Sequence, residues 1–568
     1  MGPLQVQQLR KRKQALWNER SGRGWDAHWQ ELSNYIHPRA LRLYKSRRNQ
    51  GTKQNQFIIN GTATKASRIL SSGMHAGNTP PSRPWFRLAP FDPESNNDAE
   101  ARRYLNDVRD ILLELYAKTN TYNALPRMYR HLGDFGVACQ IIFESERDTF
   151  RHHVLSPGTY CLALDENFKP DTLYRTVQLS VRQIVRAFGD EKASTGIKDA
   201  QRNGRLDDTF EIINVIEPNE EANPMLYDRG GKPWRSVWFE MDDSSDDILL
   251  ESGFNTKPFN AVRWEVEGED AYANSPGMEA LGDIKALQHM EKRKAQLIDK
   301  LVNPPMVGPA ALRNEQASLR PGMVTYLDSQ TGQKFEPAFT VDARGLQEIR
   351  ADIQEKERLI NSAYFADLFL MLANTAVPNM TAREIEERHE EKMLQLGPVL
   401  ERISDELLDP MIDRTFDVAH RAGVLPDAPD SLQGQATKVE YISILAQAQK
   451  LVATVGIERF VGFIAQNAEL FPDMIDKVDS DRVADHYADM TGVDPDIIRS
   501  DEEVEGIRAE RQAQQQAAQM AEQSAAMPNI AGAMKTAGDT DLTNLAALNE
   551  QFAKTGGQEV EPESLEAV

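Results

Sequence analysis

Apolar residues at helical spacing dominate the first 120 positions of the chain. Leu, Trp, Tyr and Ile recur at intervals of three and four over 5–36 and 97–118, the spacing that lines one face of a helix. A shorter helix is predicted over 61–75. The first helix should end at His37-Pro38, because proline disfavours helical backbone at the preceding residue. The prolines within 78–86 predict an extended connection.

Beyond residue 137 the pattern changes to short runs rich in Val, Ile, Phe, Tyr and Trp, which are typical of strands. Turn signals separate these runs, as at Ser156-Pro157-Gly158 and Arg229-Gly230-Gly231. No strand–helix alternation suggests a doubly wound sheet, so the predicted fold class is α+β with a mixed or antiparallel sheet. Strands are expected at 137–144, 151–165, 171–180, 208–216, 235–241, 247–251 and 259–266.

Two long helical patterns flank a turn-rich segment in the middle of the chain. The first, 276–302, ends before Pro304-Pro305, and the second covers 341–371. Because the intervening 306–339 is β-like, we expect a helical hairpin with a small β insert at its tip. The run Glu291-Lys292-Arg293-Lys294 in the first helix has no apolar position. A helix with such a broken stripe cannot bury one continuous face within a monomer, so we expect it to pack against other copies.

The C-terminal third is predicted to be helical and then polar. After a break over 373–380, Thr381 and Glu384 fit a capping box that starts a third helix, which should run to about Ala422. Further helix is expected over 437–500. Ala, Gln and Glu, which favour helix, dominate 509–526, and the small polar residues of the last forty positions predict disorder.

The charge of the chain is acidic overall and unevenly distributed. The net charge is −22 and the isoelectric point is about 5.0, which argues against a protein that wraps nucleic acid by neutralising phosphates. It remains compatible with a conduit to which DNA must not adhere. Residues 1–50 hold eleven Lys and Arg against three Asp and Glu, whereas 431–568 hold ten against twenty-four. We therefore expect the two ends of the chain to meet different partners.

The cysteine and hydropathy patterns indicate a cytoplasmic protein. With two cysteines in 568 residues, no disulfide framework is expected. No apolar run approaches the roughly 20 residues that cross a bilayer. The Met-Gly-Pro-Leu-Gln start lacks the features of a signal peptide. We therefore expect no membrane partner.

No catalytic or cofactor motif stands out in the sequence. Walker A, dinucleotide-binding, nucleophile-elbow and His-Glu-x-x-His patterns are all missing. We accordingly expect no enzymatic activity, no cofactor and no bound metal. Three groups of residues that could carry chemistry are better explained as ordinary core or surface positions: Cys139 and Cys161; His152 and His153; and Asp481, Asp485, His486 and Asp489.

An ordered set of segments resembles the head-to-tail connector (portal) proteins of podovirus-type, short-tailed bacteriophages. In the N-terminal part the set comprises Tyr35-Ile36-His37-Pro38-Arg39, Ile69-Leu70-Ser71-Ser72-Gly73-Met74, Thr79-Pro80-Pro81 and Pro84-Trp85-Phe86-Arg87-Leu88. The most specific run comprises Pro378-Asn379-Met380-Thr381-Ala382-Arg383-Glu384, Leu396–Arg402, Glu406-Leu407-Leu408 with Pro410, and Gly423-Val424-Leu425-Pro426. Each motif alone is weak, but the ordered set is specific, and the resemblance covers roughly residues 5–500.

The resemblance implies the phage portal fold, with a ring of twelve copies at one capsid vertex. It also implies a division of the chain into parts: 1–270 as the wing, 271–305 as the first stem helix, 306–340 as the clip, 341–371 as the second stem helix, 372–381 as the tunnel loop, 382–429 as a long wing or crown-base helix, 430–508 as the crown, 509–530 as a helical barrel and 531–568 as a disordered tail.

The implied function is a channel for genome packaging and ejection. Double-stranded DNA would pass a tunnel loop made of Asn374, Thr375, Ala376, Val377, Pro378, Asn379 and Met380. The clip would contact first the terminase large subunit and then the tail adaptor, through Arg313, Arg320, Tyr326 and Gln330. The major capsid and scaffold proteins are further implied partners, in the virion and, during assembly, in the host cytoplasm.

Three basic residues of the first stem helix are candidates for a sparse basic rung in that channel. These are Arg293, Lys294 and Lys300. Salt bridges between subunits are the alternative role for the same side chains, and the sequence leaves both roles open.

Two other functions are weighed against the portal. A scaffold or internal core protein should be mostly helical, so the β-rich block over 137–266 argues against it. A metal-dependent nuclease needs a carboxylate cluster that holds a divalent ion, and the sequence shows no defensible cluster of this kind.

Overall fold

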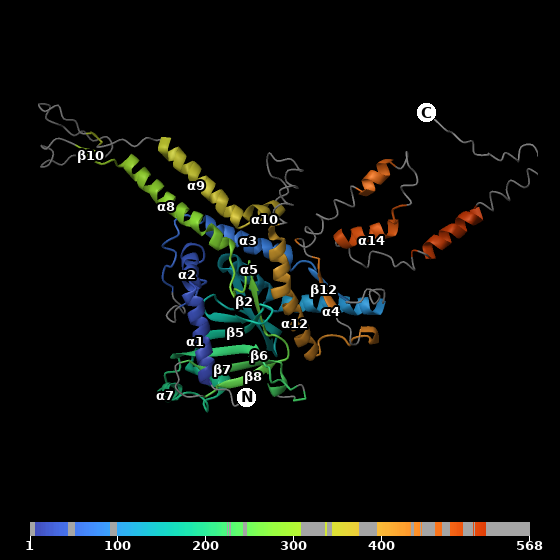
Figure 1. Cartoon of the computed structure of the whole chain (residues 1–568), viewed down its shortest axis with the longest axis horizontal. Coiled ribbons are helices and arrows are strands. Elements are labelled where there is room, and N and C mark those ends of the chain that lie inside the picture. Colours follow the sequence, from blue (N-terminus) through green and yellow to red (C-terminus); the bar gives the residue numbers. More distant parts are fainter. Residues whose placement is uncertain are drawn as a thin grey trace, which may run out of the picture. The chain divides into compact units, whose positions relative to one another are not determined.

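The computed structural model divides the chain into two units, Met1–Gly492 and Val493–Val568. The described residues are 6–43, 51–90, 99–223, 225–226, 229–241, 247–307, 336–337, 344–373, 395–432, 437–442, 445, 460–467, 477–491, 504 and 506–518. Within these ranges the first unit is a body of helices and antiparallel sheets from which a helical hairpin projects (Figure 1). No helix of the described ranges has the length and apolar character needed to cross a membrane.

The N-terminal helices are α1 (Val6–Gly22), α2 (Trp25–Tyr35), α3 (Thr62–Asn78), α4 (Ala99–Lys118) and α5 (Thr121–Phe135). The predictions over 61–75 and 97–118 are confirmed by α3 and α4. The single helix expected over 5–36 was wrong, because Gly24 adopts a left-handed conformation with φ of 89° and separates α1 from α2. The sequence did not predict α5, which is buried along most of its length.

Two antiparallel sheets form the β part of the body and confirm the predicted α+β class. The five-stranded sheet has the order β4–β5–β6–β7–β8 and the three-stranded sheet the order β3–β2–β9. The strand predicted over 151–165 is divided at the turn around Gly158 into β3 and β4. The strand bounds are β2 (Val137–Ser145), β3 (Thr149–Val154), β4 (Tyr160–Leu164), β5 (Pro170–Ser180), β6 (Thr209–Pro218), β7 (Trp234–Glu240), β8 (Leu250–Phe254) and β9 (Phe259–Arg263).

Helices cover the five-stranded sheet. From α1, Val6 and Leu9 pack against Ile213 and Val215 of β6. The short helices α6 (Val181–Phe188) and α7 (Thr195–Arg202) pack against Ile212, whose side chain points to the other face. Serine residues cap both short helices, which the sequence did not predict.

The hairpin consists of α8 (Pro276–Val302) and α9 (Arg344–Ala363), which lie side by side (Figure 1). At its tip β10 (Met306–Val307) pairs with β11 (Glu336–Pro337). These elements confirm the predicted helix–β–helix order. The continuous helix expected over 341–371 was wrong: the chain turns at Phe365, with φ of 53°, and continues as α10 (Ala366–Ala373).

The C-terminal part of the first unit returns to the body. Within the described residues the third helix covers 395–421, with a π-helical segment at Ser404–Leu408 followed by α12 (Asp409–Arg421). The helix expected to begin at 437 was wrong there, because β12 (Thr437–Tyr441) pairs antiparallel with β1 (Phe86–Pro90). Farther on, α14 (Ser480–Thr491) is helical as expected. In the second unit, 506–518 is helical.

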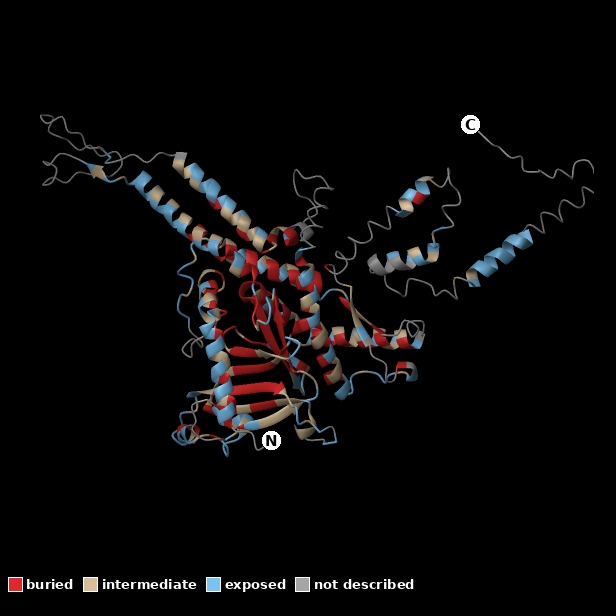
Figure 2. Cartoon of the chain, viewed as in Figure 1, coloured by how far each residue is buried: buried red, intermediate tan, exposed pale blue. Residues whose placement is uncertain are grey.

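One large hydrophobic core joins these parts, and Figure 2 shows its buried residues within the body and at the base of the hairpin. It includes residues of α2, α3, α5, β2, β9, α10 and α12 and the first half of α8. Trp29 and Trp85 are fully buried, and the Trp29 indole donates a hydrogen bond to the Phe135 carbonyl at 3.1 Å. The hairpin is therefore rooted in the same core that holds the sheets.

Candidate functional site: the hairpin and its attachment

The hairpin begins at a capped helix end that touches α5. The Ser275 hydroxyl accepts a hydrogen bond from the Met278 amide at 3.1 Å and donates one to the Asp134 carbonyl at 3.2 Å, so one side chain caps α8 and ties it to the body. Gly277 permits the close approach: a Cβ there would lie 2.7 Å from the Asp134 carbonyl oxygen. The direction in which α8 leaves the body is therefore fixed by its first turn.

Asp134 contacts both ends of the hairpin, the start of α8 through its backbone carbonyl and the end of α9 through its side chain. Its buried carboxylate contacts His37 at 3.2 Å and Arg130 at 3.7 Å, and it accepts a hydrogen bond from the Tyr364 hydroxyl at 3.4 Å. Tyr364 stands where α9 ends. Burial, and then the charge of Asp134, raise the pKa of Tyr364 well above its usual value, so the hydroxyl stays protonated and remains a donor.

The loop 55–60 fastens the two hairpin helices together. The side-chain oxygen of Gln288 accepts hydrogen bonds from the backbone amides of Ile59 and Asn60 at 2.7 and 2.8 Å. The Asn60 side chain donates to Glu291 of α8 at 3.2 Å and to Glu357 of α9 at 2.8 Å. The loop therefore bridges α8 and α9, in addition to the direct ion pair between Lys356 and Asp283 at 2.6 Å.

Beyond this loop, the side chains of α8 and α9 are mostly exposed or only partly buried (Figure 2). Near the end of α8, Ile298 is 38% exposed and Val302 is 71% exposed, and Val307 follows at 54%. A series of exposed aliphatic side chains at one end of a rigid element marks a contact surface. The expectation that α8 packs against other copies stays a prediction.

The three basic candidates of α8 do not all lie on one face of the helix. Lys294 is ion-paired with Glu291 at 2.6 Å and is partly buried. Arg293 and Lys300 are exposed. Successive residues of a helix point about 100° apart, so Arg293 and Lys294 face different directions.

The other predicted site residues lie outside the described part of the chain. These are the tunnel-loop residues Asn374, Thr375, Ala376, Val377, Pro378, Asn379 and Met380 and the clip residues Arg313, Arg320, Tyr326 and Gln330. The described residues place the ends of α8 and α9 on either side of the clip segment and the end of α10 directly before the tunnel-loop segment.

A buried ion pair attaches the third helix to the sheet. Arg263 of β9 and Glu406 of the π-helical segment meet at 2.6 Å, with side chains 3% and 5% exposed. The Glu406 carboxylate also accepts a hydrogen bond from the Arg263 backbone amide at 2.9 Å. The Arg263 guanidinium donates hydrogen bonds to the backbone carbonyls of Asp270 and Phe168. The local widening of a π-helix occurs at the segment that carries Glu406.

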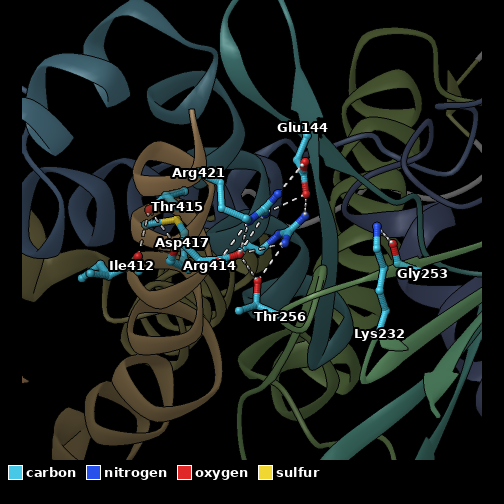
Figure 3. A network of polar contacts seen from close by, with 10 residues as sticks. Glu144, Lys232, Gly253, Thr256, Ile412, Arg414, Thr415, Asp417 and Arg421 are labelled. Carbon is cyan, nitrogen blue, oxygen red and sulfur yellow. Dashed lines mark hydrogen bonds and ion pairs between the residues drawn. The ribbon is translucent and has the colours of Figure 1, made fainter. Parts of the chain in front are cut away.

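A second polar network holds α12 against β2 (Figure 3). Arg414, nearly fully buried, donates to Glu144 at 2.9 Å and to Thr256 at 2.7 Å, and Arg421 binds both Glu144 and Asp417. Hydrogen bonds from Arg421 lower the pKa of Glu144, with a further contribution from Arg414, while burial lowers the pKa of Arg414. The network is structural: every charge faces an opposite charge within the body.

The residues with potential chemistry are held in unreactive forms. Burial raises the pKa of Cys139, and raises that of Cys161 to about 11, so both thiols are protonated at neutral pH. His152 is buried and His153 exposed, as expected for adjacent strand residues, and burial lowers the pKa of His152 to about 3. No group of three or more potential metal ligands occurs among the described residues. The side chains of Asp485, His486 and Asp489 lie outside them.

Sequence reasoning missed the polar residues that position the hairpin and the third helix. Asp134 and Glu406 are carboxylates that are each followed by a large apolar residue, Phe135 and Leu407. A charged residue within an apolar helix face needs a partner when buried, and this signal could have marked both. Gln288 carried no such signal, because its partners lie in a distant loop.

Comparisons with known proteins agree with the resemblance seen in the sequence. The family model described as "Bacteriophage head to tail connecting protein" matches residues 6–498. The portal protein of Salmonella phage epsilon15 is 44% identical over 551 residues, which are 96% of this chain and 98% of that protein. The probable portal protein of Bordetella phage BPP-1 is 43% identical over 498 residues, 88% of this chain and 90% of that protein.

Similarity to solved structures is much lower. A chain from the virion of a native gene transfer agent particle aligns over 71% of this chain and 86% of its own length, with 12% identity and a TM-score of 0.35. A score this low does not relate the two folds. On the family match and the two relatives, the chain belongs to the bacteriophage head-to-tail connecting proteins.

Proposed function

We propose that this chain is a portal protein whose copies form a ring of twelve at one capsid vertex, the channel for genome packaging and ejection. The observation that carries the proposal is the 44% identity to the epsilon15 portal protein over nearly the full length of both chains. Portal proteins are structural components of the virion, and we assign this chain the same location, after assembly in the host cytoplasm.

The hairpin supports a division into portal parts. We assign 271–305 and 341–371 to the stem and 306–340 to the clip, because two long helices leave the body side by side and end at the β10–β11 pair. The body formed by 1–270 and the helix of 382–429 is assigned to the wing. We assign 372–381 to the tunnel loop, 430–508 to the crown, 509–530 to a helical barrel and 531–568 to a disordered tail.

DNA passage requires a channel wall that surrounds the duplex but binds it weakly. Affinity for DNA rises with each phosphate that a protein neutralises. Residues 374–380 carry no charge and the chain has a net charge of −22. We therefore assign the sliding contact with double-stranded DNA to these tunnel-loop residues and no catalytic role to any residue.

The remaining partners follow from the position of each part. The clip residues 306–340 would contact the terminase large subunit during packaging and the tail adaptor afterwards, and the wing would contact the major capsid and scaffold proteins. No cofactor is assigned.

Native mass spectrometry combined with negative-stain imaging of the full-length protein tests this function. We expect particles with a central hole and a mass near twelve subunits of 64.0 kDa. A compact dimer or tetramer with closed symmetry and no hole would overturn the proposal.

A further inference from the structure

One outer face of α8 carries a row of basic side chains. Lys285, His289, Lys292 and Arg293 are all exposed, and Gln296 continues the row. At about 100° per residue, these positions occupy one sector of the helix. The opposite sector holds Asp283, which is paired with α9, and the buried Leu287. The row therefore points away from α9.

Apolar side chains border this basic row. A hollow of about 360 Å³ lies between α8 and the loop that contains Phe57 and Ile59. Phe57 is 42% exposed and Ile59 is 56% exposed, and the Phe57 ring lies 5.8 Å from that of Tyr35. Exposed aromatic and aliphatic groups with a polar rim are typical of a protein–protein contact, whereas contacts to duplex phosphates are made by basic and polar groups and use no apolar ones.

The outer face of α9 has the opposite charge. Glu348, Asp352 and Glu355 are exposed and follow one another at spacings of four and three, which places them on one face. The buried residues Ile353 and Ile360 lie about 120 to 140° around the helix from Glu348, on a different face. The hairpin thus has a basic face on α8 that points away from α9, and an acidic row on α9 that lies beside Lys356, the residue that pairs with Asp283 of α8.

Four of these charges lack an ion-pair partner within the described residues. Glu355 is paired with Arg358 at 2.8 Å and Lys285 with Glu31 at 3.1 Å. No carboxylate of the described chain lies within ion-pair distance of Lys292 or Arg293, and no cation lies so close to Glu348 or Asp352. Like charges one turn apart repel, so each row gains if opposite charges are brought to it.

The two rows also lie at matching heights along the hairpin. The Lys356–Asp283 pair sets a common level for the antiparallel helices. At 1.5 Å per residue, the basic row from Lys285 to Arg293 extends from about 3 to 15 Å beyond that level. The acidic row from Glu355 to Glu348 extends from about 1.5 to 12 Å in the same direction. Rotation about a ring axis along the hairpin brings groups of equal height together.

We propose that the basic face of α8 in one subunit docks on the acidic face of α9 in a second copy of the chain. The contact is heterologous, since different faces meet, and repetition of such a contact closes a ring. It rests on the proposed portal function and gives residues to the subunit interface of the stem. It assigns Arg293 to subunit contact and not to the DNA channel.

A disulfide cross-link tests the register of this contact. In the full-length chain, Lys292→Cys combined with Glu348→Cys places one thiol on each face at nearly equal height. Oxidation should give a ladder of covalent oligomers beyond the dimer, and each single variant at most dimers. The native Cys139 and Cys161 are buried and do not interfere. Intact rings without a ladder would overturn the proposed register.

Charge reversal tests the energetic part of the proposal. Lys292→Glu with Arg293→Glu should lower the fraction of protein in rings on the order of tenfold at equal concentration, because like charges then meet across the interface. Adding Glu348→Lys and Asp352→Lys should restore the rings. Arg202→Glu on exposed α7 is the control, and it should leave ring formation as in the wild type.

The outcomes separate this inference from the portal function. If the reversed variant still forms rings as well as the wild type, the proposed interface is wrong and the portal function stands. Intact rings that retain less DNA would assign the basic face to the channel. A wild-type protein that forms no rings under any condition, including capsid assembly, would overturn both.

Discussion

Charged groups of the body form ion pairs with partners in the same chain, whereas several charged and apolar groups of the outer hairpin are exposed and have no such partner among the described residues. In the body, Arg263 and Glu406 are buried against each other, and Arg414 has Glu144 beside it. In the outer hairpin, Val302 is exposed, and Lys292 and Asp352 have no ion-pair partner among the described residues. These ion pairs of the body are formed within one chain, whereas the proposed interface would bring the charges of further copies to the outer hairpin.

The stability of the folded monomer and the stability of the assembled ring should therefore depend on different regions. Substitutions in the body should change the free energy of unfolding of the monomer. Substitutions on the outer hairpin should leave the monomer nearly unchanged and alter assembly.

The largest effect is expected from Glu406→Ala. Removing one partner of a buried ion pair leaves the Arg263 charge uncompensated and should lower the free energy of unfolding by about 3–5 kcal/mol. Chemical denaturation of the monomer measures this. The neighbouring Asp405→Ala is the control: its ion pair with Lys169 is exposed and should contribute less than about 1 kcal/mol. Equal losses in both variants would contradict the account.

The next largest difference in monomer stability is expected between alanine variants of two isoleucines of α8. Ile284→Ala in the buried root should cost about 2–5 kcal/mol of monomer stability. Ile298→Ala in the exposed half should change it by no more than about 0.5 kcal/mol. The same two proteins should be ranked by ring yield: Ile298→Ala should lower the yield although its monomer is stable. A destabilised Ile298→Ala monomer would show that the outer hairpin is packed within one chain.

Two glycines of α8 give a smaller contrast. A methyl group at Gly277 would lie 2.7 Å from the Asp134 carbonyl oxygen and 2.8 Å from the Tyr364 hydroxyl, so Gly277→Ala should cost about 1–3 kcal/mol. Gly282 has open space around it, and Gly282→Ala should stabilise the helix by about 0.5–1 kcal/mol. Thermal denaturation of both variants measures the difference, and a neutral Gly277→Ala would mean that the hairpin root is loosely packed.

The smallest effect is a pH dependence at Glu144. Its pKa in the folded protein is lowered from the ordinary 4.5 by Arg421 and Arg414. The contribution to stability is therefore present above pH 4.5 and is lost as the pH falls through the lower folded value. Stability curves of the wild type and of Glu144→Gln between pH 6 and pH 3 should converge toward low pH. Curves that stay parallel would show that these arginines do not stabilise the carboxylate.

Local patterns in the sequence predicted most helices and strands but not how they join. The runs over 137–266 gave the strands because alternation and β-branched residues act locally. The strand β12 was predicted as helix because its partner, β1, lies far away in the sequence. The breaks at Gly24 and Phe365 were missed, since an apolar stripe continues across both.

The candidate site was predicted in outline only. The broken stripe at Glu291–Lys294 predicted a helix that packs against other copies, and this stays a prediction. The proposed contact with a neighbouring subunit needed the structure, because only the arrangement of α8 and α9 shows that the basic and acidic rows lie on different faces of the hairpin at matching heights. Asp134 and Gln288 act through partners that no local pattern reveals.

A reconstruction of the assembled protein by electron cryo-microscopy shows whether neighbouring subunits cover the outer hairpin while the body is held together by contacts within one chain. We predict a closed ring of twelve subunits around a hole, with α8 of each subunit packed along α9 of the next. A closed dimer, or a ring whose subunits meet only through their bodies while the hairpins stand apart, would contradict it.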